Sequence, residues 1–261
     1  MAASLGWATP VIAGNWKMNK GPQSARLFAA EFSARYAPID SQTVVVCPPT
    51  IAFTSFADAM SGRRDIVLGV QNIHWEKEGA FTGEVNASMA KEAGAQIALI
   101  GHSERRHVFG ETDEEVQKKV QSALKAGLTP VICVGEKLDE RKAGKVDDVI
   151  LRQLRTAIDG FTSDQAFAFL VAYEPVWAIG TGVTATPEDA SAAHATLRRF
   201  LKEQLGEDGL AVPILYGGSV KPDNSESLLT AEYVDGLLIG GASLDPEGFA
   251  RICRRSSDGA V

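Results

Sequence analysis

The sequence predicts an α/β protein of the (β/α)8 type, in which eight parallel strands close into a barrel inside an outer ring of helices. Three observations lead to this prediction. Short apolar runs alternate with segments of helical periodicity eight times along the 261 residues, and such alternation is typical of a parallel sheet. The apolar runs are continuous, which indicates strands buried on both faces. The chain length also matches eight such units.

An open, doubly wound sheet is the alternative architecture for the same alternation. It is disfavoured because no GxGxxG turn follows the first predicted strand, and that turn is typical of the dinucleotide-binding form of the open fold. No stretch has the composition of a linker. We therefore expect one domain over residues 1–261, with 1–9 as an N-terminal extension and 256–261 as a flexible tail.

The predicted strands are the apolar runs, at residues 11–14, 43–47, 66–70, 97–100, 129–134, 166–173, 212–216 and 235–239. The helices that follow them are predicted at 22–36, 53–60, 86–93, 112–126, 145–158, 187–205, 223–230 and 246–253. The clearest helix start is at residues 186–189, where an N-cap threonine precedes a proline and two acidic residues. The helix from Thr112 begins with acidic residues and continues into lysines, as the helix dipole favours.

Composition limits the classes of function. No apolar stretch is long enough to cross a bilayer, and a net charge of −7 without any basic run argues against a nucleic-acid surface. Three cysteines, Cys47, Cys133 and Cys253, lie far apart without a CxxC pair, which suits a reducing compartment. Residues 1–9 lack the pattern of a signal peptide. We therefore expect a cytoplasmic protein that binds neither membranes nor nucleic acid.

Residues 172–182 carry the strongest functional signal. Glu174 ends the sixth predicted strand, and the proline after it restricts the backbone of the glutamate. An exposed loop with Val, Trp and Ile close together makes sense if its apolar face closes over something and excludes water. A core strand running into a buried turn is the alternative, but it would not need the Gly-Thr-Gly that follows. We interpret the segment as a base and a lid, the lid being Pro175, Val176, Trp177, Ala178, Ile179, Gly180, Thr181 and Gly182.

Other polar residues follow the predicted strands at the same end of the barrel, where they face one mouth. His102 precedes a short helix predicted at 103–106, whose N-terminus disfavours imidazolium and so favours a neutral donor. Lys17 supplies a cation, and Glu104 is interpreted as its ion-pair partner. A structural histidine and a solvated lysine are the alternatives. The full set is Asn15, Lys17, His102, Glu104, Glu174, Gly217, Gly218, Ser219, Gly240 and Gly241.

Two glycine-rich turns in this set, 217–219 and 240–241, each lead toward a helix. They are plain turns or, as we expect, places where backbone N–H groups cradle a phosphate, because the loops after strands seven and eight are the usual phosphate site of this fold. A base, a neutral electrophile, a lysine and a phosphate cradle under a lid predict proton transfer next to a carbonyl on a small phosphorylated substrate. No residue spacing predicts a metal and no cofactor motif is present, so we expect neither.

Four motifs closely resemble the signatures of the triosephosphate isomerase family. They are VIAGNWKMN at 11–19, GHSERR at 101–106, AYEPVWAIGTG at 172–182 and YGGSV at 216–220, and the resemblance runs in order from about residue 11 to 251. It implies a TIM barrel that interconverts dihydroxyacetone phosphate and D-glyceraldehyde 3-phosphate through a cis-enediolate, in glycolysis and gluconeogenesis, without a cofactor. The neutral histidine and the closing loop are known properties of this family.

The resemblance also implies a role for each matching residue. Glu174 would shuttle the proton, His102 would polarise the carbonyl, and Lys17 would draw in the anionic substrate beside the donor Asn15. Backbone groups of Gly180, Ser219, Gly240 and Gly241 would clamp the phosphate. The family is usually a homodimer whose third loop, similar to residues 71–84 here, inserts into the partner. We therefore expect a dimer contact at Gln71, Asn72, Thr82, Gly83 and Glu84.

Two other functions fit parts of the pattern. Another phosphosugar barrel enzyme, such as an epimerase or a phosphoribosyl isomerase, would keep the phosphate cradle but replace the glutamate, histidine and lysine set. A non-catalytic barrel kept for binding or structure would be expected to lose a chemical group or the lid glycines. All of these residues are present, so the isomerase is the favoured function.

Overall fold

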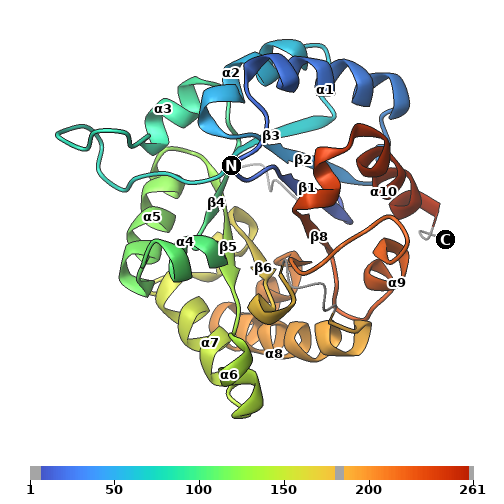
Figure 1. The fold of residues 1–261 in the computed structure, drawn as a ribbon. Coiled ribbons are helices and arrows are strands. Elements are labelled where there is room, and N and C mark those ends of the chain that lie inside the picture. Colours follow the sequence, from blue (N-terminus) through green and yellow to red (C-terminus); the bar gives the residue numbers. More distant parts are fainter. Residues whose placement is uncertain (1–6, 180–184, 259–261) are drawn as a thin grey trace.

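The computed structural model describes residues 7–179 and 185–258. Its eight strands form a closed barrel in sequence order, each parallel to its neighbours, and the helices surround them (Figure 1). The predicted (β/α)8 fold is therefore confirmed. The strands are β1 (Val11–Asn15), β2 (Thr43–Cys47), β3 (Ile66–Val70), β4 (Ile97–Ile100), β5 (Thr129–Val134), β6 (Leu170–Tyr173), β7 (Ile214–Tyr216) and β8 (Gly236–Ile239).

The helices occupy the intervals that the apolar periodicity predicts. One short helix was not predicted, α6, which follows β5 just before α7. The helices are α1 (Pro22–Arg35), α2 (Thr50–Ala59), α3 (Ala87–Glu92), α4 (Ser103–Val108), α5 (Asp113–Lys125), α6 (Leu138–Lys142), α7 (Val146–Ala157), α8 (Pro187–Leu205), α9 (Ser225–Leu229) and α10 (Pro246–Asp258). The predicted cap at Thr186 is present, since its side chain accepts a hydrogen bond from the N–H of Asp189.

Two separate apolar clusters explain why the strands are continuously hydrophobic. Alternate residues of each strand point into the barrel or out toward the helices. On β1, Val11 and Ala13 belong to the inner cluster, whereas Ile12 belongs to the outer one. Both faces of the sheet are thus largely removed from water, so most strand residues are apolar or small, with Asn15 at the end of β1 as a polar exception.

Two predicted boundaries differ from the structure by more than three residues. The strand predicted at 166–173 begins only at Leu170, because Ser163–Ala168 forms a 3-10 helix. Thr162 caps this helix, and its N–H donates to Oε1 of Gln165 at 3.0 Å. The final helix continues to Asp258, past the predicted end at 253, and takes in part of the predicted tail. The rest of that tail, 259–261, and residues 1–6 of the predicted extension lie outside the described residues.

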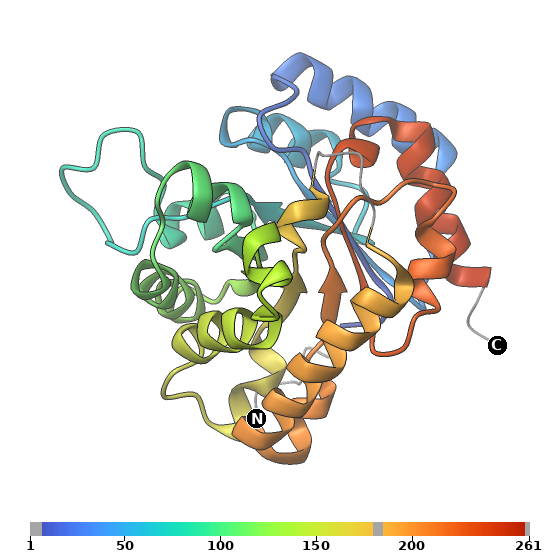
Figure 2. The same ribbon diagram turned by 60° about the horizontal axis from the view of Figure 1, so that its bottom comes forward.

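The segment between β3 and α3 stands out from the barrel, as Figures 1 and 2 both show. It contains residues 71–84, the loop that the sequence predicts to contact a second subunit. In the part of the chain that the structure describes, no helix is long and apolar enough to cross a membrane. The carboxyl ends of the strands lie at the opposite end of the barrel from their amino ends, so the loops that follow them converge on one mouth.

Candidate functional site

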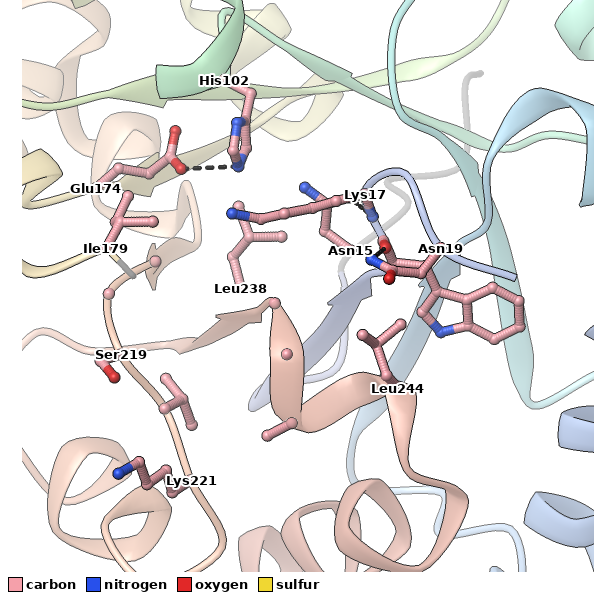
Figure 3. Close-up of a pocket in the computed structure, with 17 residues that line it drawn as sticks. Asn15, Lys17, Asn19, His102, Glu174, Ile179, Ser219, Lys221, Leu238 and Leu244 are labelled. Atoms are coloured by element: carbon pink, nitrogen blue, oxygen red, sulfur yellow. Dashed lines mark hydrogen bonds and ion pairs between the residues drawn. The ribbon is translucent and has the colours of Figure 1, made fainter. Parts of the chain in front are cut away.

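The strand-end residues surround one cavity of about 470 Å³ at the mouth of the barrel (Figure 3). They arrive on different strands: Asn15 ends β1, His102 follows β4, Glu174 follows β6, and Ser219 follows β7. These positions are up to 204 residues apart in sequence (219 − 15), and the closed barrel brings them together. The lining residues of the predicted set are Asn15, Lys17, His102, Glu174, Gly217, Gly218, Ser219, Gly240 and Gly241.

Glu174 is almost fully buried at the cavity wall. Its Oε2 accepts the N–H of Ser103 at 2.9 Å, and its Oε1 accepts the Ser103 hydroxyl at 3.2 Å and lies 3.0 Å from Nε2 of His102. Burial alone would raise the pKa of Glu174, but His102 and the Ser103 N–H outweigh burial and lower it below its ordinary value. The buried carboxylate is therefore ionised. Ser103 is a partner that the sequence analysis did not identify.

A close backbone approach fixes the position of Glu174. A Cβ atom on Gly135, the residue after β5, would lie 1.7 Å from the carbonyl oxygen of Glu174. Only glycine allows the two chains to pass this closely. On the other side, a Cβ on Gly217 would lie 2.9 Å from Cγ of Glu174. The glutamate is thus held between the ends of two neighbouring strands.

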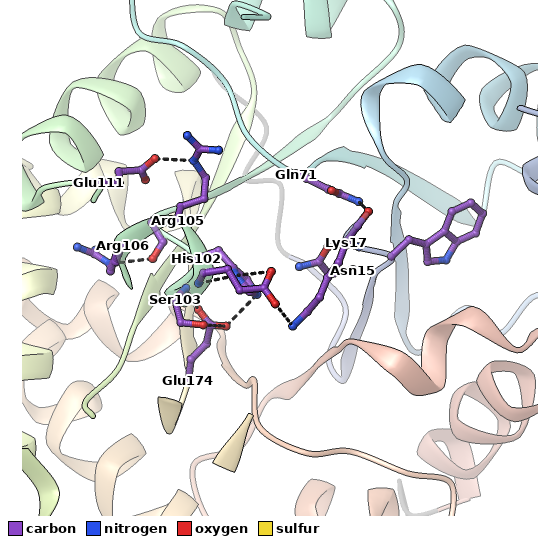
Figure 4. A network of polar contacts seen from close by, with 12 residues as sticks. Asn15, Lys17, Gln71, His102, Ser103, Arg105, Arg106, Glu111 and Glu174 are labelled. Carbon is purple, nitrogen blue, oxygen red and sulfur yellow. Dashed lines mark hydrogen bonds and ion pairs between the residues drawn. The ribbon is translucent and has the colours of Figure 1, made fainter. Parts of the chain in front are cut away.

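His102 is the N-cap of α4, and its Nδ1 accepts the N–H of Glu104 at 3.2 Å. A neutral ring then carries its proton on Nε2, which faces Glu174 (Figure 4). Burial lowers the pKa of His102, while the contact with ionised Glu174 raises it, and the net shift is upward. We assign the neutral Nε2–H form nevertheless, because imidazolium would set an Nδ1–H against the N–H of Glu104.

Lys17 lies beside these two residues with an unusual backbone, at φ 53°. Left-handed backbone costs a non-glycine residue on the order of 1 kcal/mol. Two contacts offset that cost: the Lys17 N–H donates to Oδ1 of Asn15 at 2.9 Å, and its carbonyl accepts from Nε2 of Gln71 at 2.9 Å. The ammonium group meets Oε1 of Glu104 at 2.6 Å. The structure thus brings together the lysine and the carboxylate that the sequence analysis paired.

The two glycine turns form the opposite wall of the cavity. Gly241 opens a short 3-10 helix, Gly241–Leu244, and the Ser243 hydroxyl donates to the carbonyl of Gly240. Within the described residues, the N–H groups of Ser219 and Gly241 have no hydrogen-bond acceptor. Such unpaired N–H groups are ready to bind an anion. Residues 7–179 and 185–258 contain no group of three or more side chains suited to hold a metal ion.

The first part of the predicted lid is folded down onto the barrel. Residues Val176–Ala178 form a 3-10 helix, and Nε1 of Trp177 donates to Oε1 of Glu136 at 2.7 Å. The Tyr173 hydroxyl donates to the same oxygen at 3.2 Å. The guanidinium of Arg141 lies 4.5 Å from the centre of the Trp177 ring. Three predicted lid residues, Gly180, Thr181 and Gly182, lie outside the described residues.

Sequence reasoning missed both Glu136 and Arg141. Glu136 is fully buried, and burial raises its pKa despite the bonds from Trp177 and Tyr173. Glu136 lies just past β5. The rule that residues directly after the strands face the mouth of the barrel would have identified it. Arg141 lies on α6, a helix the periodicity did not predict, and gave no comparable signal.

A second polar network supports α4 from behind (Figure 4). The buried carboxylate of Glu111 accepts from Nε of Arg105 at 2.7 Å and meets the ammonium of Lys119 at 2.5 Å. Lys119 also donates to Oδ1 of Asn72 at 2.8 Å. Arg106 donates to the carbonyl of Gly101 at 2.8 Å and pairs with Asp113 at 2.6 Å. These contacts anchor the helix whose N-terminus presents His102 to the cavity and Ser103 to Glu174.

Comparisons with known proteins agree with this geometry. A family model described as triosephosphate isomerase matches residues 10–256. Curated relatives named triosephosphate isomerase include one from Symbiobacterium thermophilum, 46% identical over 96% of this chain and 98% of its own, and one from Solibacter usitatus, 48% identical over 93% and 98%. The crystal structure of triosephosphate isomerase from Bartonella henselae superposes with a TM-score of 0.84 at 42% identity, over 95% of this chain and 98% of its own. The chain belongs to the triosephosphate isomerase family, whose reaction is the interconversion of dihydroxyacetone phosphate and D-glyceraldehyde 3-phosphate.

Proposed function

We propose that Glu174, His102 and Lys17 carry out this interconversion at the barrel mouth, with Glu174 as the base. The observation that carries the proposal is the position of the Glu174 carboxylate. It is ionised and buried, and it lies 3.0 Å from a ring nitrogen of His102 at the edge of the cavity. A proton acceptor and a neutral donor thus flank one space, as proton removal next to a carbonyl requires.

In the proposed reaction, Glu174 turns from Ser103 toward the substrate and removes the proton next to the carbonyl. The C–H electron pair forms a carbon–carbon double bond, and the carbonyl electron pair moves to oxygen. His102 gives its Nε2 proton to that oxygen and takes a proton from the neighbouring hydroxyl. Glu174 then returns its proton to the adjacent carbon. The reaction moves protons only, so we propose that it needs no metal or redox cofactor.

The substrate phosphate would bind at the glycine turns. The N–H groups of Ser219 and Gly241, which have no acceptor among the described residues, support this placement. Gly180 and Gly240 complete the proposed clamp. Lys17 passes close to the cradle, since a Cβ on Gly240 would lie 3.4 Å from its Cε. Its ammonium would stabilise the anionic substrate, with Asn15 as a neighbouring donor and Glu104 holding it in place. The lid from 175 to 182 would exclude water from the enediolate.

We also propose that the chain works as a homodimer. The chain exposes apolar side chains that a monomer would leave in water, including Met18 (95%), Ile51 (75%) and Phe109 (69%). A second cavity of about 370 Å³ lies next to Lys17, and Gln71, Asn72, Gly83 and Glu84 are among its lining residues. The projecting loop 71–84 of a partner, led by Thr82, would fill this cavity and cover the apolar side chains. We place the enzyme, as a single barrel domain, in the cytoplasm.

The test is a coupled assay of the purified protein with D-glyceraldehyde 3-phosphate in the presence of a chelator, for the wild type and for Glu174→Ala. We expect rapid isomerisation by the wild type. In the variant, kcat should fall by at least about 1000-fold, since the base contributes to the transition state alone. Inorganic phosphate should inhibit or bind both proteins alike. Near wild-type turnover by Glu174→Ala would exclude Glu174 as the base.

A further inference from the structure

Lys17, Glu104 and Glu174 do not give the cavity a positive charge that would attract an anionic substrate. The protein carries a net charge of −7, and the proposed substrate is a phosphate dianion, so the global field repels it. The charged side chains that line the cavity are Lys17, Glu174 and Lys221. Lys17 is already paired with Glu104 at 2.6 Å, and Glu174 is ionised. Lys17, Glu104 and Glu174 therefore sum to −1, which does not attract an anion.

Lys221 supplies a positive charge that no carboxylate of the described residues offsets. It lies two residues past Ser219, and its side chain is exposed at the rim of the cavity. Among the described residues, no carboxylate lies within ion-pair distance of its ammonium, and the side chain makes no hydrogen bond. Asp223, the nearest acidic residue in sequence, lies 3.5 Å from Arg251 instead.

The backbone of Lys221 is nevertheless held in place. Oδ1 of Asn224 accepts the N–H of Lys221 at 2.7 Å, and Nδ2 of Asn224 donates to the carbonyl of Ser219 at 3.0 Å. One side chain thus clamps the whole turn between the proposed phosphate donor and the lysine. Figure 3 shows Lys221 next to Ser219, at the far end of the cavity from Lys17.

We propose that Lys221 is a capture residue, whose charge attracts the substrate phosphate to the Ser219 side of the cavity before Lys17 engages it. The inference rests on the proposed function, since it assumes a phosphate at the glycine turns. Lys221 touches no reacting atom in this account. It acts on the rate of productive encounter, and salt should screen its effect.

The size of the effect follows from the charges. Across roughly 8 Å of solvent, losing one unit charge opposite a dianion lowers association by about fivefold at low ionic strength. The Debye length falls from about 30 Å at 0.01 M to about 3 Å at 1 M, so the difference should nearly vanish in high salt. A lysine that served only to hold the turn would show a loss that salt does not remove.

The experiment compares wild type with Lys221→Gln, Lys221→Arg and Lys202→Gln. Lys202 lies in the last turn of α8, and removing it causes the same change in net charge away from the mouth. We measure kcat and KM, and the inhibition constant of inorganic phosphate, at low and high ionic strength. Lys221→Gln should lower kcat/KM and weaken phosphate inhibition by about fivefold in low salt only, with kcat little changed. Lys221→Arg and Lys202→Gln should match the wild type.

Wild-type kcat/KM in Lys221→Gln at low salt, or an equal loss at both salt concentrations, would overturn the inference. Failure of the proposed function would look different, because the wild type itself would then not isomerise the triose. In that case, calorimetric titration with inorganic phosphate still tests Lys221. Weaker phosphate binding by Lys221→Gln than by Lys202→Gln in low salt supports its role, and equal binding refutes it.

Discussion

Shortening Glu174 to aspartate tests the geometry of the site more sharply than removing the carboxylate. Glu174→Asp keeps the charge but withdraws the carboxylate by one carbon–carbon bond, about 1.5 Å. The present separation of 3.0 Å from Nε2 of His102 would become about 4.5 Å, which is beyond hydrogen-bond reach. The bond from the Ser103 N–H, now 2.9 Å, would lengthen similarly. The carboxylate would then lie too far from the substrate carbon while His102 contacts the neighbouring oxygen.

A misplacement of this size lowers kcat by about 100-fold or more. KM should change little, because the phosphate cradle is untouched. The assay is steady-state kinetics in both directions, with circular dichroism as a check on folding. Glu115→Asp is the matched control, since it removes the same methylene group from a capping box on α5 rather than from the cavity wall. If kcat of Glu174→Asp stays within about threefold of wild type, the distance argument is wrong.

Three further predictions concern other parts of the molecule. His194 is fully buried, its Nδ1–H donates to the carbonyl of Tyr233, and burial lowers its pKa to about 4. Between pH 4 and about 6.5, the unfolded chain binds more protons at this residue than the folded chain does. The free energy of unfolding is therefore highest above pH 6.5 and falls as the pH drops toward 4, and the loss at pH 5 is about 2 kcal/mol. In urea unfolding, His194→Asn should reduce this pH dependence of the free energy of unfolding. An unchanged pH dependence would contradict its assignment to His194. Arg141→Met removes the cation over the Trp177 ring together with the ion pair to Asp189, and should cost about 1–2 kcal/mol in urea unfolding at pH 7, whereas an unchanged midpoint would show that these contacts of Arg141 are not stabilising. Thr82→Glu, in the projecting loop, should dissociate the dimer in sedimentation experiments and reduce activity in parallel, a link that a fully active monomer would break.

The sequence predicts the fold well because most residues on both faces of the strands are buried. Residues such as Val11 and Ile12 face different clusters, yet both must be apolar, so each strand appears as an uninterrupted run. The same signal misled the prediction at 166–168, where an apolar run that contains the buried Ala166 forms a 3-10 helix rather than part of the barrel. Burial requires that a segment be apolar, but it does not decide whether a short apolar segment forms a strand or a helix.

The site was predictable to the extent that strand ends determine it. Residues directly after strands, such as His102 and Glu174, were placed at the mouth by the fold alone. Contacts between separate loops were not predictable, because no periodicity links them. Ser103 holds Glu174 across 71 residues of sequence, and Arg141 on α6 reaches Trp177 of the lid. Such partners depend on how loops of particular lengths pack, which only the folded chain determines.

In the proposed mechanism, the reaction proceeds by removal and return of a proton at carbon. The most direct test is to let the purified wild-type protein convert D-glyceraldehyde 3-phosphate in D2O and to follow the product by proton NMR. A carboxylate base that exchanges with solvent should leave deuterium on the carbon that receives the proton, increasingly so over many turnovers. Product that stays free of deuterium after many turnovers, together with an unchanged kcat in Glu174→Ala, would mean that hydrogen moves directly between the carbons, and would contradict the proposed role of Glu174.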